Sequence, residues 1–95
     1  MTQMTITRVP TTHASRYLQQ LCKHWSHKLE VAFDEVHGTI RFPGGAVVTL
    51  DAGAEGLDAR IEAPDAETLE RMKGVLAEHL DRFAFREAPL SFAWL

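Results

Sequence analysis

The densest group of reactive side chains is the run from Cys22 to Lys28, which reads Cys-Lys-His-Trp-Ser-His-Lys. On a helix, His24 and His27 lie on neighbouring turns, so the two imidazoles can bind one metal ion. Two ligands do not make a tight site, because zinc takes about four ligands and at least three come from the protein. A carboxylate or His79 from another element would have to complete the site.

The two histidines belong to a longer polar stripe on the same predicted helix. The residues of the stripe lie within about 60° of one another, and they are His13, Gln20, His24 and His27, with Arg16 and Tyr17 at the edges. This stripe would gain positive charge as the pH falls through about 6.5, which suits an anion, a metal ion or an acidic partner. The structural alternative is that His24, His27 and Lys28 complement the dipole at the end of the helix. The candidate binding residues are Tyr17, Gln20, His24, His27 and Lys28, and the candidate metal ligands are His24 and His27.

The single cysteine, Cys22, falls at the margin of the apolar stripe, beside Leu18 and Trp25. A reactive thiolate needs a helix N-terminus or a nearby cation, and Cys22 sits late in its helix. We therefore expect a small buried hydrophobic residue. A glycine-rich phosphate loop and a Gly-x-Ser-x-Gly elbow are both absent from the sequence. These observations argue against an enzyme, and a Cys22-dependent enzyme is the weakest function that we consider.

Two helices are expected from hydrophobic spacing. The first runs from residue 13 to near residue 27, after a strand over residues 4–9, and Thr11 or Thr12 is its expected N-cap. The second begins after Asp65 as N-cap. It places His79 at the edge of its apolar face, where we expect its ring to be satisfied by the core.

The strands between the helices follow from alternating apolar residues and turn signals. They are expected near residues 31–33, 40–42, 46–50 and 57–63. In the first turn between them, Gly38 is expected to supply a positive φ. A last strand is expected over residues 90–94, where Leu90, Phe92 and Trp94 alternate with small residues.

The resulting order, β-α-β-β-β-β-α-β, predicts an α+β two-layer sandwich. Its sheet should be mostly antiparallel, with both helices covering one face. The opposite face would carry side chains of both signs, namely Glu30, Asp34, Arg41, Asp58, Arg60 and Glu62. We interpret it as a solvated face with cross-strand ion pairs. It could also receive a protein partner or pair in a homodimer.

Length and composition limit the classes of function. A chain of 95 residues predicts a single domain over residues 1–95. It has no run of about 18 apolar residues and no signal-peptide pattern, so we expect no membrane span and a cytoplasmic location. The net charge is −3, whereas nucleic-acid-binding domains tend to be strongly basic, so we expect no nucleic acid partner. Residues 1–28 nevertheless contain four basic residues and no acidic one, Arg8, Arg16, Lys23 and Lys28. They could form a local anion-attracting surface.

Four segments resemble the bacterial domain-of-unknown-function family numbered 2218. They are SRYLQQLCKHWSHK at 15–28, GTIRFP at 38–43, HLDRFAFRE at 79–87 and the closing LxFxW at 90–94. The resemblance covers nearly the whole chain, and the first motif is long enough to be specific. The family has no established activity. Some relatives accompany siderophore-interacting or iron-uptake proteins, so the resemblance implies a link to iron handling.

The family's recurring positions correspond here to Tyr17, Leu21, Cys22, His24, His27, Lys28, Phe83, Phe85, Arg86 and Glu87. His13 departs from the pattern, since relatives often carry an acidic residue there. Arg86 joins the candidate binding residues, although Arg86 and Glu87 together favour a structural role that fastens the end of the second helix to the first.

The sequence thus predicts a small non-enzymatic binding or accessory domain that uses the His24/His27/Lys28 end of its first helix, in iron or siderophore handling. A metal ion is a candidate cofactor, and nothing in the sequence requires one. The alternative is an interaction or dimerisation module that uses the open face of the sheet.

Overall fold

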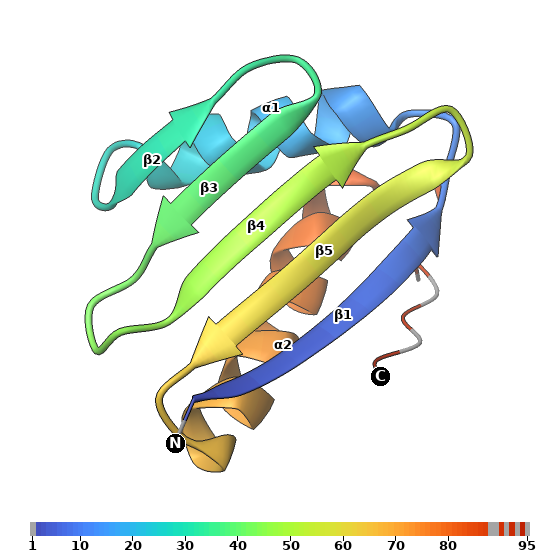
Figure 1. Cartoon of the computed structure of the whole chain (residues 1–95). Helices are drawn as coiled ribbons and strands as arrows, with labels where there is room; N and C mark the ends of the chain where they lie inside the picture. The colour runs from blue at the N-terminus through green and yellow to red at the C-terminus, as the bar shows by residue number, and fades with distance from the viewer. Residues whose placement is uncertain (1, 88–89, 91, 93, 95) are drawn as a thin grey trace.

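The computed structural model describes residues 2–87 together with Leu90, Phe92 and Trp94. Its elements are β1 (Gln3–Pro10), α1 (Ala14–Trp25), β2 (Glu30–Phe33), β3 (His37–Arg41), β4 (Val47–Ala52), β5 (Gly56–Ala63) and α2 (Ala66–Phe83). The strands form one antiparallel sheet in the order β1-β5-β4-β3-β2, which Figure 1 shows with the helices behind it. This arrangement confirms the α+β fold class. None of the described helices is long and apolar enough to cross a membrane.

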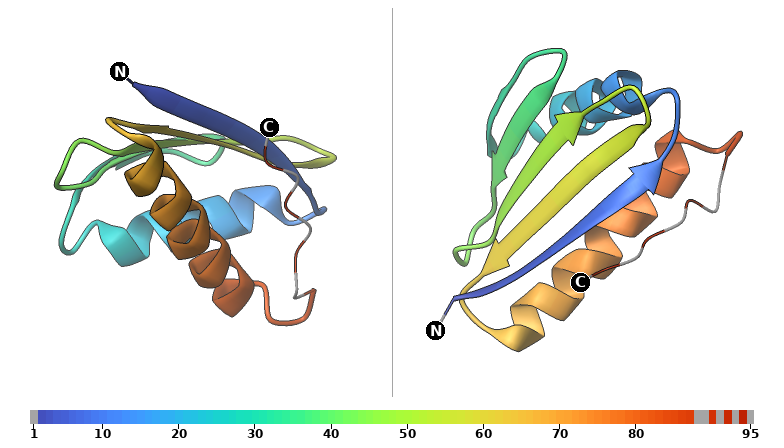
Figure 2. Two further views of the ribbon diagram at one scale, coloured as in Figure 1. Left: turned by 90° about the horizontal axis from the view of Figure 1, so that it is seen from below. Right: turned by 45° about the vertical axis from the view of Figure 1, so that its right-hand side comes forward.

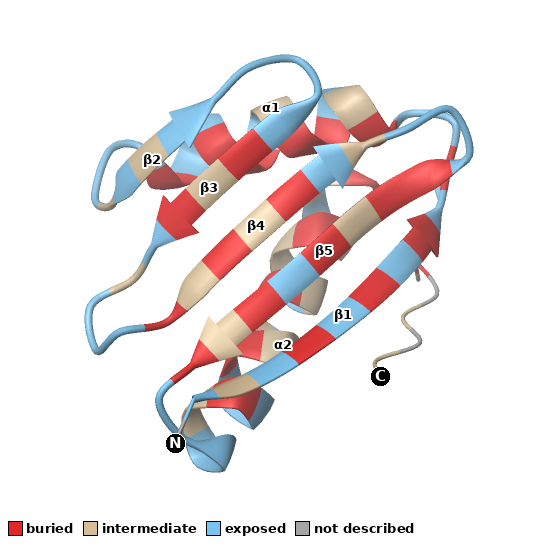
Figure 3. Cartoon of the chain, in the orientation of Figure 1, coloured by how far each residue is buried: buried red, intermediate tan, exposed pale blue. Residues whose placement is uncertain are grey.

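The two faces of the sheet have different environments. Both helices lie against one face and the other is uncovered, as Figure 2 shows. Along β1, β4 and β5, buried and more exposed residues alternate (Figure 3), because successive side chains of a strand point to opposite faces. The core between the layers holds the largest fully buried side chains, including Leu18, Leu21, Ile61, Leu76 and Leu80.

Helix α1 begins later than the sequence predicted. Its N-cap is His13, which makes no side-chain capping bond, so the expectation of Thr11 or Thr12 as N-cap was wrong. The hydroxyl of Thr11 instead accepts the backbone N–H of His13 at 3.0 Å. Threonine forms such local turns readily, and this one sets the entry of the chain into α1.

Helix α2 begins as predicted, at its N-cap Asp65. The carboxylate accepts the backbone N–H of Thr68 at 2.7 Å, which satisfies one of the free donors of the first turn. That hydrogen bond holds the pKa of Asp65 below its usual value. The apolar stripe of α2 then buries Leu69, Met72, Leu76 and Leu80.

The expectation for Gly38 was wrong. In the described part of the chain, the glycines with positive φ are Gly44 and Gly45, in the loop before β4. Gly38 lies inside β3 and is buried against α1. A Cβ atom there would lie 2.7 Å from the sulfur of Cys22. Glycine is needed at this position because the helix approaches the strand closely.

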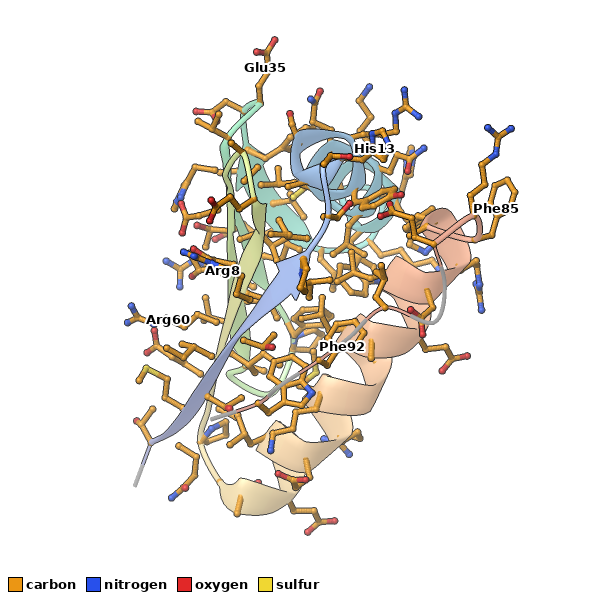
Figure 4. The ribbon with its side chains drawn as sticks, turned by 90° about the vertical axis from the view of Figure 1, so that its right-hand side faces the viewer. Arg8, His13, Glu35, Arg60, Phe85 and Phe92 are labelled. Carbon is orange, nitrogen blue, oxygen red and sulfur yellow. The ribbon has the colours of Figure 1, made fainter. Side chains whose placement is uncertain are left out.

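The last predicted strand is not among the five strands that the structure describes. Leu90, Phe92 and Trp94 are not in a strand, while residues 88, 89, 91, 93 and 95 lie outside the described residues. The apolar side chains of this segment contribute to the core instead: Leu90 is buried, and the rings of Phe92 and Trp94 pack against the core. Figure 4 shows Phe92 on the helix side of the sheet. The backbone N–H of Leu90 donates to Asp81 in α2 at 2.9 Å.

Candidate functional site

The histidine cluster of the sequence is divided by the end of α1. Helix α1 stops at Trp25, so His24 occupies its last turn and His27 lies in the turn that follows. The ring of His24 lies near that of His79 in α2, with 5.5 Å between the ring centroids. The structure therefore pairs His24 with a histidine of the other helix. A metal site that uses His27 stays a prediction.

Aromatic side chains surround this histidine pair. The ring of His79 lies 4.8 Å from that of Trp25, and the ring of His24 lies 5.7 Å from that of Phe83. Phe42 packs edge-on against Trp25 at 5.0 Å. The Nδ1 atom of His79 also lies 2.7 Å from the carbonyl oxygen of Val75. These contacts position the two rings at the junction of α1 and α2.

A shallow hollow of about 220 Å³ lies farther along the same junction. It is lined by Arg16, Tyr17 and Gln20 from α1, and by Phe83, Phe85 and Arg86 from the end of α2 and the turn after it. We call these six residues the α1–α2 hollow. Phe85 is 71% exposed and projects away from the fold in Figure 4. Three of the predicted binding residues, Tyr17, Gln20 and Arg86, thus lie on one surface, and Phe83 connects it to His24.

The two arginines of this hollow differ from most other arginines of the chain, which form ion pairs with carboxylates. Within the described residues, neither Arg16 nor Arg86 has an ion-pair partner. The guanidinium of Arg86 lies 5.7 Å from the ring centroid of Phe85, a cation–π contact. By contrast, four arginines are within 3.7 Å of a carboxylate, namely Arg8, Arg41, Arg60 and Arg82. The hollow therefore carries two guanidinium groups that form no ion pair within the described residues.

The acidic group closest in sequence to Arg86 is engaged in holding the fold. The carboxylate of Glu87 accepts the hydroxyl protons of Tyr17 and Thr11, the latter at 3.0 Å to its Oε2 atom. The hydrogen bond from Tyr17 keeps the pKa of Glu87 below its usual value. Burial, and then the same bond to Glu87, raise the pKa of Tyr17. These bonds fasten the turn that carries Phe85 and Arg86 to α1, as expected of Glu87. Arg86 was expected to share this role, but its contact is with the ring of Phe85.

Cys22 has the environment of a core residue. Its side chain is fully buried, as the sequence predicted, and burial raises the pKa of its thiol to about 11. A thiol with such a pKa stays protonated and is a poor nucleophile at neutral pH. In the described part of the chain, no three His, Cys, Asp or Glu side chains are placed to hold one metal ion.

The uncovered face of the sheet pairs most of its charges internally. Arg8 binds Asp58 at 2.7 Å and Arg41 binds Glu30 at 3.1 Å, in both cases across neighbouring strands. Arg60 binds Glu62 of its own strand at 2.9 Å. The first two contacts confirm the predicted cross-strand ion pairs. The expectation was wrong for Arg60 and Glu62, which pair within one strand, and for Asp34, which lies after β2 and accepts the backbone N–H groups of Val36 and His37 at 2.8 Å. Arg8 and Arg60 point away from the helices in Figure 4.

A second hollow, of about 540 Å³, lies on this uncovered face. It is lined by residues of β1, β4 and β5, among them Ile6, Arg8, Thr49, Asp58 and Arg60. Ile6 is 41% exposed, and Met4 of the same strand is 54% exposed. The face is therefore mostly charged, with a small apolar area on β1.

Sequence reasoning placed some residues of the site and missed the role of others. Arg16 entered as the edge of a stripe and as one of four basic residues of an anion-attracting surface, and Phe85 entered only through the family resemblance. His79 was expected at the edge of the core with its ring satisfied. It does lie against Val75 and Trp25, but only its Nδ1 atom has a hydrogen-bond partner among the described residues. The distance between His79 and His24 depends on how α1 and α2 cross, and the spacing of residues within one helix does not predict that crossing.

Comparison with known proteins gives a family and a solved relative. Residues 6–95 match the model of the family described as an uncharacterized protein conserved in bacteria, DUF2218. The NMR structure of the protein PA4090 from Pseudomonas aeruginosa is similar, with a TM-score of 0.81 and 35% identity over 97% of this chain and 94% of that one. No curated protein sequence matches the chain.

Proposed function

The chain belongs to this uncharacterized bacterial family, and we propose that it is a non-enzymatic binding domain that takes an anionic group in the α1–α2 hollow. The observation that carries the proposal is the pair of arginines without ion-pair partners, Arg16 and Arg86, on one hollow among the described residues. Guanidinium groups bind carboxylates and phosphates through parallel hydrogen bonds. The ligand would therefore present a carboxylate or a phosphate.

The other residues of the hollow suit the same ligand. The amide of Gln20 can donate to an anion, and the exposed ring of Phe85 offers an apolar surface beside it. The hollow is smaller than the 300–1,000 Å³ that drug-sized ligands occupy. It therefore suits a small anion or one acidic group of a larger partner.

The hollow lies near the end of α1 at which binding was expected from the sequence. Through Phe83, its ligand would lie beside His24, toward the His24/His27/Lys28 end of α1. An accessory role in cytoplasmic iron or siderophore handling, which the family resemblance implies, is the setting that we propose for it. The buried, protonated thiol of Cys22 supports a role without covalent catalysis.

An NMR titration tests the proposal, with inorganic phosphate and benzoate as probes. We expect saturable amide shifts at Arg16, Gln20 and Phe85, and their loss in the Arg16→Ala/Arg86→Ala double variant. Arg71→Ala is the matched control, because Arg71 is an exposed arginine of α2 that does not line the hollow. Equal binding by the double variant, or equal loss in Arg71→Ala, would contradict the proposal.

The uncovered sheet face supports a second candidate, a homodimer. The observation in its favour is the hollow around Ile6 and Arg60, with the exposed side chain of Met4 on the same strand as Ile6. A dimer through this face predicts a mass that rises with protein concentration and a shift toward monomer in Arg41→Glu or Arg60→Glu. Sedimentation equilibrium measures both. A monomer at all concentrations would rule this candidate out.

A further inference from the structure

We propose that His24 and His79 form a two-imidazole site for a divalent transition-metal ion, with zinc as the reference ion. The two residues belong to different helices, and their ring centroids are 5.5 Å apart. A zinc–nitrogen bond is about 2.0–2.1 Å long, which puts each ring centroid about 3 Å from the metal. At bond angles from tetrahedral to trigonal, two such rings have centroids about 5–5.5 Å apart. The observed separation matches that spacing.

The hydrogen bond of His79 determines which of its nitrogens is available. A carbonyl oxygen only accepts hydrogen bonds, so the 2.7 Å contact with Val75 places the proton on Nδ1. In the neutral ring, Nε2 then carries the free lone pair. A backbone carbonyl that binds the second nitrogen of a histidine in this way is the usual support of a metal ligand.

The lone pair on Nε2 of His79 is also accessible. Among the described residues, this atom has no hydrogen-bond partner. In the described residues, every buried polar side-chain atom has a hydrogen-bond partner. Nε2 of His79, which lacks a partner, is therefore at least partly exposed to solvent. His79 is thus a half-buried residue whose unpaired nitrogen opens to the outside.

His24 is suited to supply the second nitrogen. Its side chain is exposed, and it is carried on the last turn of α1, a rigid element. The rings of Phe83 and Trp25 lie 5.7 and 6.3 Å from that of His24 and limit its positions. Two imidazoles positioned before the ion arrives lose less conformational entropy on binding than two free side chains.

The coordination would be completed from outside the chain. In the described residues, no third His, Cys, Asp or Glu joins the pair. Water or an anion would fill the remaining positions. With two protein ligands in place of the usual three or four, the site would bind zinc weakly. Imidazole ligands suit zinc, copper and nickel. This site goes beyond the anion hollow, because it requires neither Arg16 nor Arg86.

The test is a titration of the metal-free protein with zinc chloride in a buffer without phosphate or carboxylate. It is followed by the ring ¹⁵N and ¹³C signals of all five histidines. We expect saturable shifts at Nε2 of His79 and at one ring nitrogen of His24. His24→Ala and His79→Ala should each weaken binding at least about tenfold, the loss expected when a metal site is disrupted.

His37→Ala is the matched control, because His37 is also an exposed histidine and lies in β3, away from the junction of α1 and α2. It should bind zinc as the unchanged protein does. His24→Ala keeps the test informative if His79→Ala does not fold, since His24 is exposed. Equal affinity in His24→Ala, or the largest loss in His37→Ala, would overturn the proposal. The Arg16→Ala/Arg86→Ala variant should bind zinc normally, so the anion proposal can fail without this one.

Discussion

Glu87 connects two parts of the chain that are far apart in the sequence, the turn after α2 and the region of α1. Its carboxylate accepts hydrogen bonds from Tyr17 in α1 and from Thr11, which precedes α1. Both bonds favour the charged form, so the pKa of Glu87 is lower in the folded protein than in the unfolded chain. The stability that they contribute is complete above the unfolded pKa of about 4.3 and is lost as the pH falls through the lower folded pKa.

Urea unfolding at pH 7, 4 and 3 tests this role of Glu87. We expect Glu87→Gln to lower the free energy of unfolding at pH 7 and to lose less of it than the unchanged protein between pH 4 and 3. Tyr17→Phe removes one donor, so it should cost about 1 kcal/mol at pH 7 and show the same weaker acid dependence. Parallel pH profiles in all three proteins would contradict the prediction.

Gly38 shows how one missing Cβ sets the distance between sheet and helix. In Gly38→Ala the new carbon would meet the sulfur of Cys22 at 2.7 Å and a methyl group of Leu18 at 3.4 Å. Overpacking of this kind costs about 1–3 kcal/mol. Cys22→Ala removes the sulfur, so Gly38→Ala should cost less in the Cys22→Ala background. A double-mutant cycle of urea unfolding measures this coupling, and additive losses would show that the sulfur is not the obstacle.

At the scale of elements, α2 carries a glycine that its environment does not require. A Cβ at Gly74 would meet no atom within 4 Å. Gly74→Ala should therefore raise the free energy of unfolding by about 0.5–1 kcal/mol, because alanine has less backbone freedom to lose. Gly56→Ala is the opposite case, since its Cβ would lie 2.6 Å from the carbonyl oxygen of Val9. Thermal unfolding should place the midpoint of Gly74→Ala above, and that of Gly56→Ala below, the unchanged protein.

The elements divide into those that local pattern predicts and those that it does not. The clean alternation of Leu57, Ala59 and Ile61 and the cap at Asp65 gave β5 and the start of α2, because these signals act within a few residues. Leu90 and Phe92 alternate equally well, yet they pack on the core outside the sheet, and alternation alone cannot distinguish those two uses. The positions of Gly38 and of the His24–His79 pair depend on packing between distant elements.

At the scale of the whole molecule, a row of ionisable side chains crosses the uncovered face of the sheet. Arg8, Asp58, Asp51 and His37 follow one another on β1, β5, β4 and β3. The two aspartates are directly opposite, a repulsive arrangement. Each has a basic partner on its other side, Arg8 at 2.7 Å from Asp58 and His37 at 2.7 Å from Asp51. The charge of Arg8 therefore offsets part of the repulsion at the centre of the row, and His37 is a hydrogen-bond partner for the second aspartate.

This arrangement predicts that Arg8 stabilises the fold by offsetting the repulsion between Asp51 and Asp58. Arg8→Ala should lower the free energy of unfolding only slightly at pH 7, since the pair is exposed to solvent. The hydrogen bond from Arg8 lowers the pKa of Asp58, so the loss should shrink as the pH falls through that pKa and the aspartate becomes neutral. Asp51→Asn removes the facing charge and should recover part of the loss at pH 7, as should added salt. Urea unfolding of the single and double variants measures both effects. If Asp51→Asn lowered the stability of Arg8→Ala further, the two aspartates would not be the interaction that Arg8 balances.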